Sequence, residues 1–147
     1  LGYIEEAFLA YKTERYNIKG KDVVAGNCKY YLNDLSFKNF LYPGFAYGVG
    51  YLLENAVYLE LRRLGYIVYT GSFRDKEVDF VAMKDDRVIY LQATNMLETA
   101  QTMEREYAPL LTIGDNYEKY VVSMDEVQFP SNEGVRHIQA WNLKEIL

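Results

Sequence analysis

Apolar residues recur with the period of a helix between residues 49 and 64. With a step of about 100° per residue, one broad arc holds the apolar positions Leu52, Leu53, Ala56, Val57, Leu59, Leu61 and Leu64. Glu60 falls in the middle of this arc and Glu54 at its rim. We predict an amphipathic helix over 49–64, ended by Gly65 in the left-handed conformation. Glu60 is expected to pair with an arginine such as Arg63, three positions on.

Short apolar runs bounded by turn residues predict strands after this helix. These strands are expected at 66–69, 78–82, 88–93, 120–123 and 135–138. Asp85-Asp86 predicts a tight turn before the third of them. A second helix is expected over 98–111, and a short helix at the C-terminus. A hairpin, a crossover helix and a further strand fit a three-layer α/β fold with a mixed sheet.

Residues 1–42 differ in pattern from the rest. They predict the end of a helix, a β-hairpin with strands near 8–13 and 28–32, and a turn between them. Pro43-Gly44, followed by two more glycines, marks the join. We therefore divide the chain into a partial winged-helix-like segment, 1–42, and an α/β domain, 43–147. Forty residues rarely form a core of their own, so the first segment is expected to lean on the rest or on missing sequence.

Composition limits the class of protein. The chain has 147 residues, of which 50% are hydrophobic and 25% charged, which is typical of a folded domain. The net charge of -5 argues against a generic nucleic-acid coat. The longest apolar runs fall short of the roughly 20 residues of a membrane span, so no membrane partner is expected. With no signal peptide visible, a cytoplasmic location is the default. The first residue is Leu1, so we expect a piece of a longer protein.

Single residues exclude two further classes. One cysteine, Cys28, excludes an internal disulfide framework, and one histidine, His137, argues against a histidine-rich zinc site. Cys28 is expected to be a small buried apolar group, and His137 an ordinary residue on the face of a strand.

The chain contains fifteen tyrosines. Such residues favour amphipathic packing surfaces, in a core or against a partner. The tyrosines considered for stacking on nucleic-acid bases are Tyr30, Tyr31, Tyr42, Tyr47, Tyr51 and Tyr58. Given the acidic balance of the chain, we favour a core or an interface for them.

Four residues could carry chemistry: Glu54 on the first long helix, Asp79 and Gln92 on neighbouring strands, and Thr94. Asp79 and Gln92 are thirteen positions apart across a hairpin and can lie side by side. Gln92 and Thr94 share one face of their strand. Phosphodiester hydrolysis uses such oxygens to hold Mg²⁺, which activates a water. A nearby lysine usually completes the site.

Three of these residues also have a structural interpretation. Glu54 can be a helix-surface acid near the N-terminal turn. Asp79 lies between apolar strand residues and needs a partner, for which Arg74 or Lys76 would serve as well as a metal. Gln92 could cap the backbone of the neighbouring strand.

Several sequence motifs in fixed order resemble a known family. They are Lys29-Tyr30-Tyr31-Leu32-Asn33-Asp34, Gly50-Tyr51-Leu52-Leu53-Glu54-Asn55, Leu61-Arg62-Arg63-Leu64-Gly65-Tyr66, Glu77-Val78-Asp79-Phe80-Val81, Tyr90-Leu91-Gln92-Ala93, Arg105-Glu106 with Pro109-Leu110, and Asp115-Asn116-Tyr117 with Lys119-Tyr120-Val121. Over essentially the whole chain this resembles the C-terminal domain of unknown function of many prokaryotic AAA-type ATPases. The resemblance implies a missing N-terminal ATPase domain, a winged-helix-like linker and the restriction-endonuclease-like PD-(D/E)XK nuclease fold.

The resemblance also implies roles for the four candidate residues. Glu54 matches the helix glutamate of the nuclease fold, and Asp79 matches its metal-binding aspartate. Gln92 stands where the fold usually has Glu or Asp. Thr94 stands at the position of the lysine, and threonine cannot supply that charge. Lys84 or Lys119 could reach in from elsewhere.

Three hypotheses follow. The first is a non-catalytic nuclease-like module that pairs with its ATPase, a partner protein or nucleic acid, with a second copy of the chain as a further candidate. The second is a Mg²⁺-dependent DNA nuclease that uses Glu54, Asp79 and Gln92, with the metal on Asp79 and Gln92 and a lysine from elsewhere. The third makes residues 1–42 a DNA-positioning winged helix. No Walker A loop is present, so ATP is expected to bind only to the missing N-terminal domain. Because the lysine position of the motif is Thr94 as well, we do not expect this chain to be an enzyme.

Overall fold

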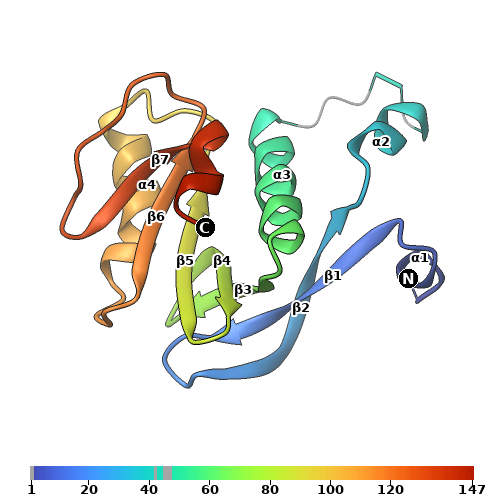
Figure 1. The fold of residues 1–147 in the computed structure, drawn as a ribbon, viewed down its shortest axis with the longest axis horizontal. Helices are drawn as coiled ribbons and strands as arrows, with labels where there is room; N and C mark the ends of the chain where they lie inside the picture. The colour runs from blue at the N-terminus through green and yellow to red at the C-terminus, as the bar shows by residue number, and fades with distance from the viewer. Residues whose placement is uncertain (1, 42, 45–47) are drawn as a thin grey trace.

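A computed structural model describes residues 2–41, 43–44 and 48–147 of the chain (Figure 1). In chain order its elements are α1 (Gly2–Glu6), β1 (Ala10–Asn17), β2 (Asp22–Leu32), α2 (Leu35–Leu41), α3 (Val49–Arg63), β3 (Ile67–Phe73), β4 (Lys76–Lys84), β5 (Arg87–Ala93), α4 (Ala100–Leu111), β6 (Glu118–Ser123), β7 (Val135–Gln139) and the 3-10 helix η1 (Ala140–Glu145). None of the helices in these ranges has the length and hydropathy of a transmembrane helix.

The seven strands form one sheet in the order β2-β1-β3-β4-β5-β6-β7. The pairs β1/β2, β3/β4 and β4/β5 are antiparallel. The pairs β1/β3, β5/β6 and β6/β7 are parallel. The predicted mixed α/β sheet is therefore confirmed.

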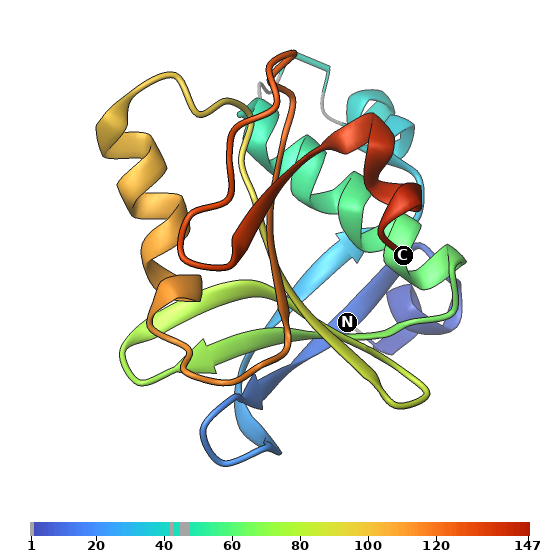
Figure 2. The ribbon, with the colours of Figure 1, turned by 60° about the vertical axis from the view of Figure 1, so that its left-hand side comes forward.

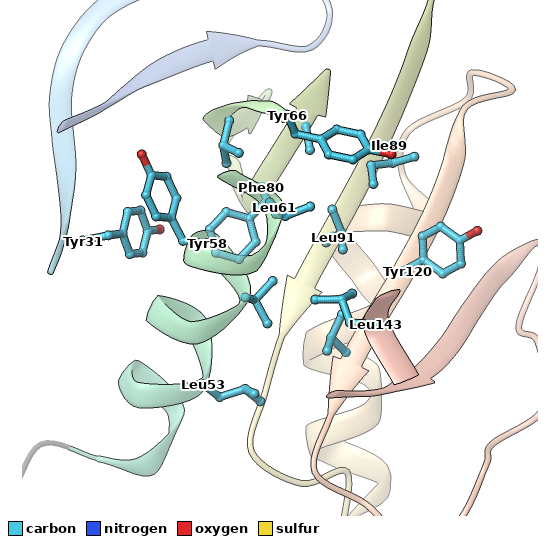
Figure 3. Close-up of a cluster of buried hydrophobic side chains, with 14 residues drawn as sticks. Tyr31, Leu53, Tyr58, Leu61, Tyr66, Phe80, Ile89, Leu91, Tyr120 and Leu143 are labelled. Carbon is cyan, nitrogen blue, oxygen red and sulfur yellow. The ribbon is translucent and has the colours of Figure 1, made fainter. Parts of the chain in front are cut away.

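Helices cover both faces of the central strands (Figures 1 and 2). On one face, Leu53, Val57 and Leu61 of α3 pack against strand residues such as Phe80 and Leu91. Figure 3 shows this cluster, with Tyr31 and Tyr58 next to each other at its edge. On the other face, a second cluster contains side chains of α4 together with Val78, Val81, Tyr90 and Val121. The two clusters explain why β4 and β5 are apolar on both faces.

Helix α3 matches its predicted bounds closely. Leu53, Val57 and Leu61 are buried, as the apolar arc requires. The helix ends at Arg63, and Gly65 follows with φ of +88°, which suits glycine because it has no Cβ. The predicted partner of Glu60 is confirmed, since its carboxylate accepts hydrogen bonds from the Arg63 guanidinium at 2.7 and 2.6 Å.

The hairpin of β1 and β2 belongs to the same sheet as the rest of the chain. Arg15, Tyr16 and Asn17 of β1 pair in parallel with β3 residues 70–72. The sheet thus continues on both sides of the boundary predicted after residue 42, which itself falls on Tyr42, outside the described residues. A winged-helix-like character of residues 1–42 stays a prediction.

Strand β2 is longer than its predicted core of 28–32 and starts at Asp22. The sequence pattern does not predict a strand at residues 22–27, because these residues lie at the edge of the sheet and are mostly exposed. An exposed edge strand needs no alternation of apolar and polar side chains.

Candidate functional site

Glu54, Asp79 and Gln92 come together at one point beside the sheet. Glu54 is on α3, Asp79 on β4 and Gln92 on β5. The backbone N–H of Asp79 donates to Oε1 of Gln92 at 3.2 Å. This contact confirms that the two strand residues are neighbours. It also confirms the structural interpretation of Gln92, since its side-chain oxygen caps the backbone of β4.

Sequence reasoning did not identify Lys29 of β2, which is at the centre of this site. Its Nζ lies 2.9 Å from Oε1 of Glu54 and 3.4 Å from Oδ1 of Asp79. It also lies 3.0 Å from Oε1 of Glu77. One ammonium group thus contacts three carboxylates. We call these four residues the Lys29 cluster.

Further donors contact the same three carboxylates. The hydroxyl of Tyr31 donates to Oε1 of Glu54 at 2.7 Å. The backbone N–H of Ala93 donates to Oδ2 of Asp79 at 3.0 Å, and Arg15 pairs with Oε2 of Glu77. Both carboxylate oxygens of Asp79 therefore have a donor within the protein.

Packing of β2 against α3 places Lys29 next to the carboxylates of the Lys29 cluster. Lys29 and Tyr31 are two positions apart in β2 and share a face of the strand. The Tyr31 ring stacks on Tyr58 of α3 with ring centroids 4.2 Å apart and planes inclined by 12°. The side chain of Asn55 accepts from the Leu32 N–H and donates to the Leu32 carbonyl, both at 2.8 Å. These contacts fix the strand beside the helix and place Lys29 next to Glu54.

The charges in the cluster shift one another's protonation. Burial raises the pKa of Asp79, Glu54 raises it further, and Lys29 and the Ala93 N–H partly offset this, which leaves the pKa of Asp79 at about 7. Burial alone would lower the pKa of Lys29, but Asp79 and Glu54 outweigh it and raise that pKa. Burial and Glu54 raise the pKa of Tyr31. At neutral pH, Lys29 is therefore a cation and Tyr31 a neutral donor.

The other basic residues proposed for the site lie elsewhere. Nζ of Lys84 donates to the Leu64 carbonyl at 2.9 Å, and Nζ of Lys119 donates to the Asp115 carbonyl at 2.6 Å. The expectation that either would complete the site is wrong.

Arg74 and Lys76 were the expected partners of Asp79. The structure has Lys29 in that role instead. Thr94 is buried just beyond β5, where its N–H donates to the Val122 carbonyl at 3.0 Å. The only sequence signal for Lys29 was its place in the motif that ends at Asp34.

The donor set does not fit Mg²⁺ in this arrangement. An ammonium group lies between the carboxylates of Glu54 and Asp79. The side-chain oxygen of Gln92 accepts a backbone N–H. Among the described residues, no group of three or more His, Cys, Asp and Glu side chains is placed to hold a metal ion. Mg²⁺ demands near-octahedral oxygen ligands and keeps several waters, and here a lysine takes that space.

A second buried polar cluster joins Ser123, Asp125 and His137, but it is not arranged as a catalytic triad. Nδ1 of His137 accepts from the Phe129 N–H at 3.1 Å, so the ring proton is on Nε2. Nε2 then donates to Oγ of Ser123 at 2.8 Å, and Oγ donates to Oδ2 of Asp125 at 2.7 Å. A histidine that already donates to the serine cannot take its proton. His137 is thus a hydrogen-bonded core residue, and burial lowers its pKa.

Cysteine and tyrosine predictions had mixed outcomes. Cys28 is only half-buried, so the expectation of a buried group is wrong. Tyr31 and Tyr58 are buried, which confirms a core role for these two. Tyr30 and Tyr51 are exposed. Tyr42 and Tyr47 fall outside the described residues.

The chain is similar to one protein of Haemophilus influenzae, which bears the name "Uncharacterized protein". The two are 36% identical over 124 residues, which cover 84% of this chain and 30% of the relative. The chain thus spans less than a third of the length of the curated relative that it matches. No family model matches the chain, and no solved structure matches it.

Proposed function

We propose that the chain is a non-catalytic, nuclease-like module of a longer AAA-type ATPase, in which the acidic residues of the site hold the protein's own Lys29. Its expected role is interaction with the ATPase part, a partner protein or DNA. ATP would bind only to the ATPase part, and the module would work in the cytoplasm.

The restriction-endonuclease-like part of this proposal is supported by element order and by the site. A helix, a hairpin, a crossover helix and a parallel strand follow one another as α3, β3 to β5, α4 and β6. Glu54, Asp79 and Gln92 approach one another as the family resemblance implies. The match covers only 30% of the H. influenzae relative. This supports the proposal that the module is part of a longer protein.

The position of the Lys29 ammonium group carries the non-catalytic part of the proposal. Metal-dependent hydrolysis needs a cation on the carboxylates and a separate positive group near the reacting phosphate. Here one lysine contacts Glu54, Glu77 and Asp79 at 2.9 to 3.4 Å, and Thr94 cannot supply a second charge. Lys29 supplies positive charge to these acids from within the chain. Lys29, Tyr31 and the Ala93 N–H donate to Oε1 of Glu54 and to both carboxylate oxygens of Asp79.

The test is nicking of supercoiled plasmid by the purified chain with Mg²⁺, Mn²⁺ or EDTA. We expect no metal-dependent nicking by the wild type, by Asp79→Ala or by the control Asp75→Ala, which changes an exposed turn residue. Metal-dependent nicking by the wild type that is lost in both Asp79→Ala and Lys29→Ala would overturn the proposal. It would instead make the chain a Mg²⁺-dependent nuclease with Lys29 as its lysine.

A further inference from the structure

Exposed apolar side chains lie along β2, α2 and the first turn of α3, and these three elements also line a groove. Ten of the sixteen large exposed hydrophobic side chains among the described residues lie between residues 2 and 52. Six of them form what we call the α2–α3 surface: Tyr30, Phe37, Phe40, Val49, Tyr51 and Leu52. Phe40 is 83% exposed and Tyr51 69%. Three of the six, Tyr30, Tyr51 and Leu52, also line the groove. Exposed apolar side chains that gather on neighbouring elements in this way are typical of an interaction site.

The groove offers room for an inserted side chain. Its volume is about 380 Å³. Apolar side chains that line it include Tyr30, Leu35 and Leu52, and Lys29 and Glu54 form part of its wall. In Figure 1, α2 lies at the open side of α3, away from the strands β4 to β7.

The sequence of this region has the composition of a protein interface. Residues 35–53 contain one charged residue, Lys38, although 25% of the whole chain is charged. They also contain six aromatic residues. Interface cores are depleted in charge and enriched in aromatic side chains. A nucleic-acid partner would require a basic surface, which this segment lacks.

We propose that the α2–α3 surface is where the ATPase part of the longer protein packs against this module. This inference rests on the proposed function, which puts an ATPase part before residue 1. The match covers 30% of the H. influenzae relative, so most of that polypeptide lies outside the matched region and could cover such a surface. A part joined ahead of α1 has a high effective concentration near residues 2–52. The occupant is expected to present apolar side chains and few charges, with one side chain in the groove.

Hydrogen exchange of the 147-residue chain and of the longer protein tests this inference. Amides of α2 and of the first turn of α3 are expected to exchange at least about tenfold more slowly in the longer protein. Amides around Trp141 in η1, which is exposed far along the chain, should not change. Phe40→Glu in the longer protein should restore fast exchange in α2. The control Val127→Glu changes a residue that is 65% exposed in the loop after β6, and should leave α2 protected.

The outcomes separate this inference from the proposed function. If the gene encodes no ATPase part, both are overturned. If an ATPase part is present but α2 amides exchange equally fast in both proteins, only the docking surface is overturned. If light scattering shows that the isolated chain is a dimer and its α2 amides are protected only at dimer-forming concentrations, the occupant is a second copy of the chain, and the inference is again overturned.

Discussion

Neutralising Asp79 is predicted to stabilise the fold most above pH 7, by less than half as much at pH 5, and hardly at all below about pH 4. The change is Asp79→Asn, which keeps the shape and removes the charge. In the folded protein, burial and the neighbouring Glu54 raise the pKa of Asp79 from 3.8 to about 7, even though Lys29 lies 3.4 Å away. The ionised carboxylate is therefore the less favourable form in the folded state.

The size and sign of the effect follow from proton linkage. Because the folded-state pKa lies above the unfolded one, the folded state binds the proton more tightly between about pH 4 and pH 7. The contribution of Asp79 to stability therefore falls as pH rises through this range and is fully lost above about pH 7. A shift of roughly 3 units corresponds to about 4 kcal/mol at 1.36 kcal/mol per unit. We expect the free energy of unfolding of Asp79→Asn to exceed that of the wild type by up to about 4 kcal/mol at pH 8.5.

Urea unfolding followed by circular dichroism between pH 5 and pH 9 measures this difference. The matched control is Asp75→Asn, in the exposed turn between β3 and β4, for which the free energy of unfolding should follow the wild type at every pH. A stability difference between Asp79→Asn and the wild type that does not change with pH would refute the reasoning. A less stable Asp79→Asn at pH 8.5 would refute it as well, because the ion pair with Lys29 would then outweigh burial.

Three further substitutions test other parts of the architecture. Lys29→Met should destabilise the fold by about 2–3 kcal/mol at pH 8.5, because it leaves Glu54 and Asp79 without their cation while Glu77 keeps Arg15. The loss should be smaller at pH 5, and the same urea titrations measure both values. Asn55→Ala should cost about 2 kcal/mol, because the Leu32 N–H and carbonyl lose their partners, and hydrogen exchange at Leu32 should accelerate. Gly71→Ala should cost about 1–3 kcal/mol, because its Cβ would lie 2.8 Å from Cγ2 of Val81, and thermal unfolding should show the loss.

The sequence predicted well the elements whose burial repeats with a fixed period. α3 is one example, since Leu53, Val57 and Leu61 are buried one turn apart. Strands β4 and β5 are another, because both of their faces are covered and their apolar runs are continuous. The sequence also predicted that Asp79 and Gln92 lie side by side, because a tight hairpin fixes which residues are opposite each other.

The cation of the site could not be predicted in the same way. Lys29 is 25 positions from Glu54 and 50 from Asp79, and no periodic pattern links residues at such separations. Its position depends on the parallel pairing of β1 with β3 and on the packing of Tyr31 against Tyr58. Both are long-range contacts. Lys84 and Lys119 are near the central strands in sequence, whereas the lysine in the site comes from the edge strand β2.

Placing the cation on β2 links the protonation of the site to the docking of the hairpin. Lys29 reaches Asp79 only while the Asn55–Leu32 hydrogen bonds and the tyrosine stack hold β2 beside α3. Undocking β2 would remove the lysine and let water reach Asp79, so that the pKa of its carboxyl group would fall from about 7 toward 3.8. The docked state therefore binds the proton more tightly, and alkaline pH favours undocking. In a site with its lysine on β5, beside the aspartate in the same hairpin, this coupling would not arise.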